Sequence, residues 1–142
     1  MSRIELTLPE RFPFATEIPV RIDDVNYGGH LGNDTVLTFA HEARLRFLAA
    51  HGWSEVDIEG VGLIMTDAAV VYRAEGRYGM VLRAEVAVGG LRSRGCDFLY
   101  RLTDVASGRE IARARTGVLF YDYGAKKVAS MPERFRQVIE GG

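Results

Sequence analysis

The sequence predicts an α+β domain in which an antiparallel sheet curls around one long helix. Two observations carry this prediction: a single helical segment follows one short extended segment, and four segments with the pattern of β-strands then come in succession. The 142 residues fit one domain with its own core, residues 1–142. Cystatin-like and other helix-on-sheet folds share this pattern, so periodicity alone leaves the name of the fold open.

The first extended segment covers residues 14–22, where Ile18, Val20 and Ile22 alternate with other residues as in a half-buried strand. Pro19 has no backbone N–H to donate, so we expect this strand at an edge of the sheet or at a bulge. Residues 23–32 contain three glycines, one asparagine and two acids. This composition predicts an ordered loop.

The helical segment begins at Asn33-Asp34-Thr35, which are residue types that cap helices, and Gly52 marks its end. Between them, apolar residues recur at helical spacing: Val36, Phe39, Ala40, Ala43, Phe47 and Leu48. Leu37, Leu45 and Ala49 widen this apolar surface. We therefore expect the helix to be largely enclosed.

The other strands are predicted within residues 62–72, 82–88, 96–102 and 110–123, which are rich in β-branched and aromatic residues or alternate with polar ones. Ala106-Ser107-Gly108 is predicted to turn the last two of these into a hairpin. A short helix is expected after Pro132, with Phe135, Val138 and Ile139 on one face.

Composition and charge argue against several classes of protein. The net charge is −1, without the excess of Lys and Arg that a nucleic-acid partner requires. Cys96 is the one cysteine, so an intrachain disulfide is impossible and a Cys-based zinc site is disfavoured. We see neither a signal peptide nor a run of transmembrane length, and expect a cytoplasmic protein without membrane insertion.

Two stretches resemble the signature of the 4-hydroxybenzoyl-CoA thioesterase-like family. Residues 21–33 read RIDDVNYGGHLGN, and residues 39–48 read FAHEARLRFL. The family pattern is an Arg, then Asp-x-Asp, then x-x-Gly-His-x-x-Asn, then a helix with Glu-Glu-Ala-Arg. The spacing matches without insertion or deletion. The resemblance implies the hotdog fold, with a five- or six-stranded antiparallel sheet wrapped around a central helix.

What the resemblance implies for function is hydrolysis of an acyl-CoA or acyl-carrier-protein thioester to free acid and thiol, with no cofactor. One position departs from the pattern, because Asn26 stands where the family has its second Asp, the nucleophile or general base. A neutral amide is not a base and attacks a thioester poorly. The usual mechanism therefore does not transfer to this chain.

A second branch of hotdog thioesterases, including those of phenylacetate catabolism, is more similar at this point. There an Asn or Gln in the loop works with a carboxylate about fifteen residues later. Fifteen residues after Asn26 stands His41, with Glu42 adjacent. A neutral imidazole is a competent general base for water. Either residue is our candidate base.

Geometry places a condition on this hypothesis. His41 lies roughly 10 Å along the helix axis, at about 1.5 Å per residue, so it reaches the loop of its own subunit with difficulty. Hotdog proteins pair subunits edge to edge. The resemblance thus implies a homodimer or homotetramer with the site at the dimer interface, where Asn26 and His41 or Glu42 come from different chains.

The remaining candidates divide between catalysis and substrate binding. The backbone N–H of Asn33 would face a thioester carbonyl as an oxyanion donor, with the helix dipole behind it, although Asn33 is equally suited to capping the helix. His30 is the loop histidine of the family and serves either the reaction or the turn itself. Candidate substrate contacts are Asp24, Tyr27, Gly28, Gly29, Phe39 and Met65, the last two along an acyl slot beside the helix.

Three further hypotheses remain. The protein is a non-catalytic binder of acyl thioesters that has lost the usual Asp, or it is a hotdog hydratase or dehydratase, which its motif fits less well. Asp23 and Asp24 suggest a metal only weakly, since a lone imidazole and no thiol lie near them in the sequence, and we predict no metal site.

Overall fold

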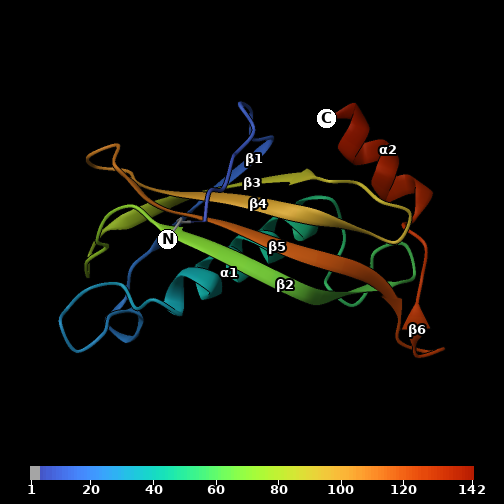
Figure 1. The fold of residues 1–142 in the computed structure, drawn as a ribbon, viewed down its shortest axis with the longest axis horizontal. Helices are drawn as coiled ribbons and strands as arrows, with labels where there is room; N and C mark the ends of the chain where they lie inside the picture. Colours follow the sequence, from blue (N-terminus) through green and yellow to red (C-terminus); the bar gives the residue numbers. More distant parts are fainter. Residues whose placement is uncertain (1–3) are drawn as a thin grey trace.

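The computed structural model describes residues 4–142 and confirms the α+β architecture. Its elements follow in the predicted order (Figure 1). They are β1 (Phe14–Pro19), a 3-10 turn η1 (Ile22–Asp24), α1 (Thr35–Ala50), β2 (Gly62–Tyr72), β3 (Val81–Gly89), β4 (Gly95–Asp104), β5 (Glu110–Asp122), β6 (Lys127–Val128) and α2 (Glu133–Gly141). The short β6 had no signal in the sequence, because two residues carry no periodicity.

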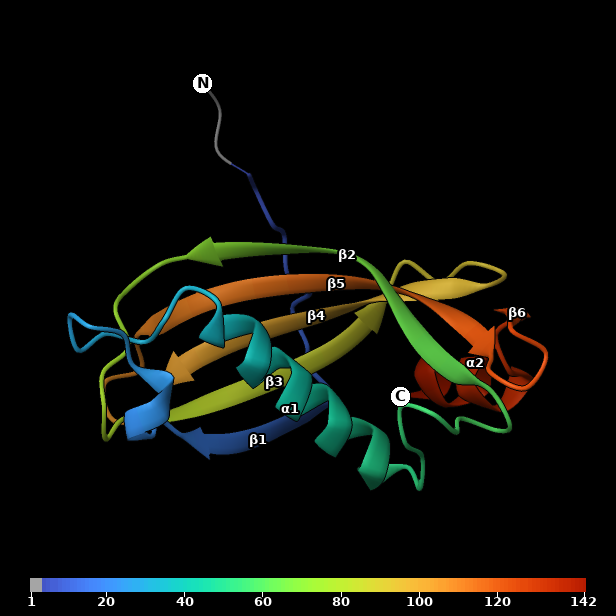
Figure 2. The ribbon, with the colours of Figure 1, turned by 90° about the horizontal axis from the view of Figure 1, so that it is seen from below.

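The strands form one antiparallel sheet in the order β1-β3-β4-β5-β2, and β6 pairs with β5. The sheet curves, and α1 lies along its inner face (Figure 2). β1 and β2 are edge strands, as expected for a strand that contains Pro19. In β2 the register shifts between Met65 and Asp67, which places a bulge at Thr66.

The first strand ends earlier than predicted. It stops at Pro19, and residues 22–24 form a 3-10 turn instead of continuing to Ile22. The cause is local: the carboxylate of Asp24 accepts a hydrogen bond from the backbone N–H of Arg21 over 2.8 Å, which closes the turn. This turn directs the chain from the sheet edge into the loop.

The core lies between α1 and the inner face of the sheet. All six residues predicted from the helical spacing are buried: Val36, Phe39, Ala40, Ala43, Phe47 and Leu48. The alternating residues of β5 meet them from the sheet, and Ala112, Ala114, Thr116, Val118 and Phe120 are also buried. Phe47 packs edge to face on Phe98 with ring centroids 5.9 Å apart.

The expectation that α1 is largely enclosed holds on one side only. Leu45 is 37% exposed and Ala49 is exposed, because the sheet of one protomer covers a single face of the helix (Figure 2). The predicted cap also differs, since the side chain of Asp34, the N-cap residue, makes no capping hydrogen bond. The outer face of α1 is therefore free to contact other molecules.

The C-terminal helix is confirmed. Phe135 of α2 is fully buried and packs between Trp53, tilted to its ring, and Phe120, edge to face, with ring centroids 5.4 and 5.1 Å away. This aromatic group closes the core at the end of α1. Among residues 4–142, no helix has the length and apolar character needed to cross a membrane.

Candidate active site

The loop after β1 is organised by the side chain of Asn26. Its Oδ1 accepts hydrogen bonds from the backbone N–H groups of Gly28, over 3.0 Å, and of His30, over 3.1 Å. The backbone N–H of Asn26 donates to the carbonyl of His30 over 2.7 Å. Gly29 closes the turn at φ +83°, a conformation that glycine adopts without strain. The sequence Asn-Tyr-Gly-Gly-His thus forms a closed local turn.

These contacts determine what the Asn26 amide offers to a ligand. Because both loop partners donate, the atom that faces them must be the carbonyl oxygen. The remaining atom, Nδ2, can only donate hydrogen bonds. Asn26 is therefore suited to polarise a carbonyl or orient a water, and unsuited to attack.

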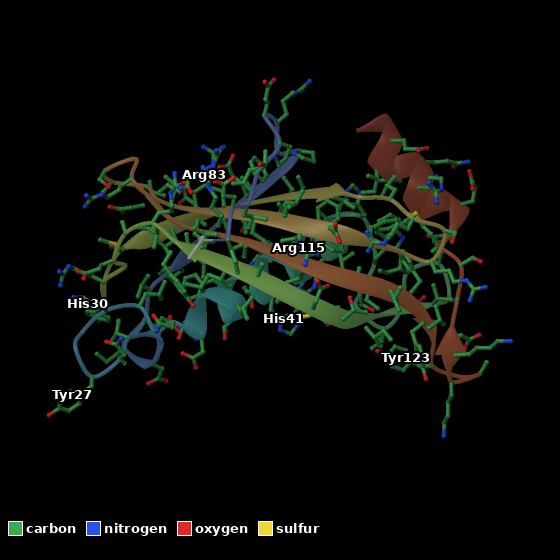
Figure 3. The ribbon with its side chains drawn as sticks, in the orientation of Figure 1. Tyr27, His30, His41, Arg83, Arg115 and Tyr123 are labelled. Atoms are coloured by element: carbon green, nitrogen blue, oxygen red, sulfur yellow. The ribbon has the colours of Figure 1, made fainter. Side chains whose placement is uncertain are left out.

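Tyr27 lies at the tip of this loop and points away from the body of the protein (Figure 3). Its side chain is fully exposed. The structure of the protomer does not bring Tyr27 to any of the cavities described below. Its predicted role as a substrate contact gains no support within one chain.

The loop borders a cavity of about 340 Å³, which we call the loop cavity. Three predicted site residues meet there: Asn26, His30 and Asn33. The far wall comes from the end of β2 and the segment after it, including Tyr72, Arg73, Ala74, Glu75 and Gly76. The sequence had placed these three residues together, and the fold does so.

Two contacts fix the walls of the loop cavity. Nε2 of His30 lies 3.2 Å from Oε2 of Glu75. The hydroxyl of Tyr72 donates to the backbone carbonyl of Asn33 over 2.8 Å. Neither Glu75 nor Tyr72 was predicted as a site residue, because both stand some forty residues away from the motif in the chain.

The helix N-terminus opens at the same cavity. α1 begins at Thr35, and Asn33 and Val36 both line the loop cavity. The first N–H groups of a helix lack partners within the helix and carry the positive end of its dipole. In this structure the N–H groups of Thr35 and Leu37 donate to the carbonyls of Gly32 and Asp34. The cavity therefore combines the Asn26 amide, the backbone just before the helix and an imidazole, which suits the binding of a polarised carbonyl.

His41 lies in a different place, on the second turn of α1. Its Nε2 is 2.9 Å from Oε2 of Glu55. It borders a second cavity of about 340 Å³, the helix cavity, lined by Leu37, Thr38, His41, Arg44, Glu55, Leu63, Met65 and Val118. Glu55 was missed by sequence reasoning, since it stands in the irregular segment after α1 where neither periodicity nor motif singles it out.

Arg44 connects this pair to the core. Its Nη1 donates to the hydroxyl of Tyr100 over 2.9 Å, and that hydroxyl lies 2.8 Å from Oγ1 of Thr116. Burial lowers the pKa of Arg44, but the contacts with Tyr100 and Glu55 outweigh it and hold the pKa above its ordinary value. Burial raises the pKa of Tyr100. The guanidinium thus stays charged and the phenol neutral.

Glu42 points elsewhere. Its Oε2 lies 2.8 Å from Nε of Arg46, which also donates through Nη1 to the hydroxyl of Thr16 and the carbonyl of Glu17. Glu42 lines a third cavity of about 230 Å³, together with Ile18, Pro19, Arg21, Asp24, Thr38, Phe39 and Arg46. The two candidate bases therefore face different cavities.

Eight of the predicted site residues are thus divided among three cavities of the chain, whereas Tyr27, Gly28 and Gly29 line none of the three. Asn26 lines the loop cavity and His41 lines the helix cavity, and the two cavities share no lining residue. His30 and His41 are well apart in Figure 3. Phe39 and Met65, expected along one acyl slot, line different cavities. Asp24 is buried and closes its own turn, in line with a structural role.

Two other features of residues 4–142 bear on the site. A larger cavity, about 760 Å³, lies between the N-terminal segment, the end of α1 and α2, and none of the predicted site residues line it. Within the same residues, no group of three or more His, Cys, Asp or Glu side chains is arranged to hold a metal ion.

The fold and the loop together define a class: a hotdog-fold protein with donors and a helix N-terminus converging on one cavity. The chain belongs to the thioesterase-like superfamily, whose model matches residues 20–139. The match identifies this superfamily, and the 4-hydroxybenzoyl-CoA branch within it stays a prediction. Among curated protein sequences, none matches the chain.

Solved structures share the fold at low sequence identity. A 1,4-dihydroxy-2-naphthoyl-CoA thioesterase from Synechocystis is 20% identical, with a TM-score of 0.80 over 89% of this chain and 94% of the other. A thioesterase superfamily protein from Jannaschia sp. CCS1 is 18% identical, with a TM-score of 0.81 over 92% and 83%. BH1999, a gentisyl-coenzyme A thioesterase, is 16% identical, with a TM-score of 0.76 over 87% and 99%. These similarities confirm the hotdog fold.

Proposed function

We propose that this protein hydrolyses an acyl-CoA or acyl-carrier-protein thioester to the free acid and the thiol, in the cytoplasm and without a cofactor. The observation that carries the proposal is the convergence of Asn26, His30 and the N-terminus of α1 on one cavity, in a member of the thioesterase-like superfamily. Such donors stabilise the oxyanion that forms when a thioester carbonyl is attacked.

The proposed reaction proceeds through water. The thioester carbonyl accepts hydrogen bonds from Nδ2 of Asn26 and from the backbone N–H of Asn33, just before α1. His41 removes a proton from a water, and the oxygen of that water forms a bond to the carbonyl carbon. The tetrahedral intermediate then collapses, the C–S bond breaks, and the leaving thiolate takes the proton from His41. One water is consumed, and acid and thiol are released.

This mechanism requires two subunits. Because the loop cavity and the helix cavity of one protomer are separate, His41 must act on a substrate held by the loop of a partner. A homodimer or homotetramer supplies this arrangement. In support, β2 is an edge strand that runs for 11 residues, so its outer backbone groups are available for pairing with another chain.

The acyl group of the proposed substrate is apolar or aromatic. Two of the similar structures are thioesterases of aromatic acyl-CoA esters, 1,4-dihydroxy-2-naphthoyl-CoA and gentisyl-CoA. Leu37, Leu63, Met65 and Val118 give the helix cavity an apolar wall beside His41. An apolar or aromatic acyl group in this cavity would place its carbonyl near the proposed base.

The experiment is a panel of acyl-CoA esters of different chain length, with benzoyl-type esters included, assayed by release of free thiol. We expect hydrolysis above the uncatalysed rate for at least one ester. Tight binding of an ester without any release of thiol would contradict hydrolysis and establish the alternative below.

The alternative function is that of a non-catalytic protein that binds acyl thioesters. One observation favours it: Asn26, at the family's catalytic position, uses its side-chain oxygen to hold the loop together. Calorimetric titration with a CoA ester and with its non-hydrolysable thioether analogue separates the two functions. A binder gives the same heat with both, and an enzyme gives a continuing heat of turnover with the ester alone.

A further inference from the structure

We propose that Glu55 is a positioning residue for His41: it holds the imidazole in the tautomer with the proton on Nε2, which leaves Nδ1 as the atom that accepts the proton of the attacking water. The inference rests on the proposed function in one respect, since His41 is the base of that reaction. The arrangement itself rests on contacts within one protomer.

The contact between the two residues is close and direct. Nε2 of His41 lies 2.9 Å from Oε2 of Glu55. A carboxylate accepts hydrogen bonds and has none to donate, so Nε2 must carry the proton in this contact. In a neutral imidazole the other ring nitrogen then has the free lone pair. The geometry therefore selects one of the two tautomers.

Glu55 is itself held in place by Arg44. The same oxygen, Oε2, lies 3.1 Å from Nε and 3.0 Å from Nη2 of the guanidinium. Arg44 is buried, and its third nitrogen donates to Tyr100. Since Tyr100 also contacts Thr116, a continuous set of polar contacts runs from the sheet to His41. A surface carboxylate on a mobile side chain would not have this support.

The backbone of Glu55 is fixed as well. Its carbonyl accepts the N–H of Leu63 over 2.8 Å at the start of β2. Gly62 allows this close approach, because a Cβ at that position would lie 2.9 Å from the carbonyl oxygen and 2.5 Å from the ring of Tyr123. Both the main chain and the side chain of Glu55 are therefore attached to the sheet.

A second imidazole and carboxylate pair in the protein lacks such an attachment. Nε2 of His30 is 3.2 Å from Glu75, whose side chain is largely exposed and shared with Arg77 over 3.1 Å. Exposed pairs of this kind contribute little, because solvent screens them. The buried attachment through Arg44 distinguishes His41 and makes its carboxylate partner a positioning group.

The chemical consequence concerns the protonated state. When His41 takes a proton from water, its ring becomes positive beside the Glu55 carboxylate, and this half-buried partner, held by Arg44, stabilises that charge. A buried carboxylate has this function in the Ser-His-Asp triad, where it orients the ring and stabilises the imidazolium. We expect Glu55 to act on the chemical step and to leave substrate binding unchanged.

Kinetics of matched variants provide the first test, in the intact oligomer. Glu55→Gln removes the charge with little change of shape, and we expect kcat to fall by about tenfold or more with KM within about twofold. Glu140→Gln is the control, an exposed acid on α2 that lies 4.0 Å from Arg136 and lines none of the three cavities. It should keep kcat within about twofold. Glu55→Asp should recover part of the loss. Equal kcat in wild type and Glu55→Gln would overturn the proposal, and so would equal losses in both Gln variants.

The second test needs no turnover. Nitrogen chemical shifts of histidine report which ring nitrogen carries the proton, and we expect His41 of the wild type to show the form protonated on Nε2. Glu55→Ala, which removes the acceptor, should give a mixture of forms. If that variant does not fold, the wild-type spectrum decides alone: a ring protonated on Nδ1 overturns the proposal. If the spectrum shows the proton on Nε2 but the protein hydrolyses no thioester, the proposed function is wrong, whereas the positioning of His41 by Glu55 still holds.

Discussion

Oδ1 of Asn26 accepts a hydrogen bond from the backbone N–H of His30 over 3.1 Å, four residues along the chain. Asn26, which we propose as an oxyanion donor, therefore also holds the loop in shape. A substitution there changes the loop and the chemistry together, unless the new side chain can accept the same two hydrogen bonds.

Asn26→Asp separates the two tasks. One carboxylate oxygen can accept the N–H groups of Gly28 and His30, so the loop should persist. The donor Nδ2 is lost, and we expect kcat to fall by about 100-fold, the usual effect of removing one oxyanion donor. Steady-state kinetics measure kcat, and thermal unfolding checks that the variant is folded. A rise in kcat would contradict this role and show that a carboxylate at position 26 acts as nucleophile or base.

A mixture of two inactive variants tests the composite site. Asn26→Asp damages the loop cavity and His41→Ala removes the base, in different cavities. In a mixed dimer one of the two interface sites regains both residues. Refolding an equal mixture should therefore restore about a quarter of the wild-type activity, since half of the dimers are mixed. If the refolded mixture is no more active than each variant alone, the composite site is wrong. Either Asn26 and His41 of one site then belong to the same chain, or one of them has no part in the mechanism.

The two candidate bases on α1 should differ in effect. We expect His41→Ala to lower kcat by about 10²-fold to 10⁴-fold, the range for loss of a general base. Glu42→Ala should change it by less than about threefold, because the Glu42 carboxylate pairs with Arg46 and faces the third cavity. Thiol release from the best substrate measures both. Full activity in His41→Ala would remove the imidazole from the mechanism.

Arg44 should contribute strongly to stability. Arg44→Met removes a buried guanidinium from the hydroxyl of Tyr100 and from the carboxylate of Glu55, whose side chain is 28% exposed. Because the Glu55 charge stays partly solvated, we expect a loss of about 2–3 kcal/mol of unfolding free energy, below the full cost of breaking a buried pair. Arg46→Met, two residues along the same helix, loses a partly exposed pair and should cost about 1 kcal/mol. Urea unfolding measures both, and equal losses would show that burial of the Arg44 charge does not matter.

Cys96 should be unreactive in the folded protein. Burial raises the pKa of its thiol from 9.0 to about 12. At pH 8 almost no thiolate is present, so iodoacetamide should modify Cys96 slowly until the protein is unfolded. Because the folded pKa is the higher one, this thiol contributes stability that is complete below about pH 9 and is lost as the pH rises toward 12. Rapid modification of the native protein at pH 8 would contradict this account of its burial.

Much of this protein is determined by contacts between residues close together in the sequence. Helical spacing from Val36 to Leu48 identified the buried face of α1, and alternation identified the strands, because periodicity reports which side of an element is buried. The loop around Asn26 is equally local, since its hydrogen bonds span two to four residues. A sequence motif can therefore specify the turn around Asn26, whereas the contacts of His30 with Glu75 and of Leu31 with Gly76 depend on the fold.

Tertiary structure decided the surroundings of His41. Arg44 meets Tyr100 and Thr116 across 56 and 72 residues of sequence, and these contacts exist because α1 packs on the inner face of the sheet. Glu55 reaches His41 from an irregular segment whose path is set by its pairing with Leu63 at the start of β2. The same packing sends Glu42 to another cavity although it is adjacent in sequence. Spacing along the chain gives the position of a residue on its helix, and only the packed sheet determines which partner its side chain meets.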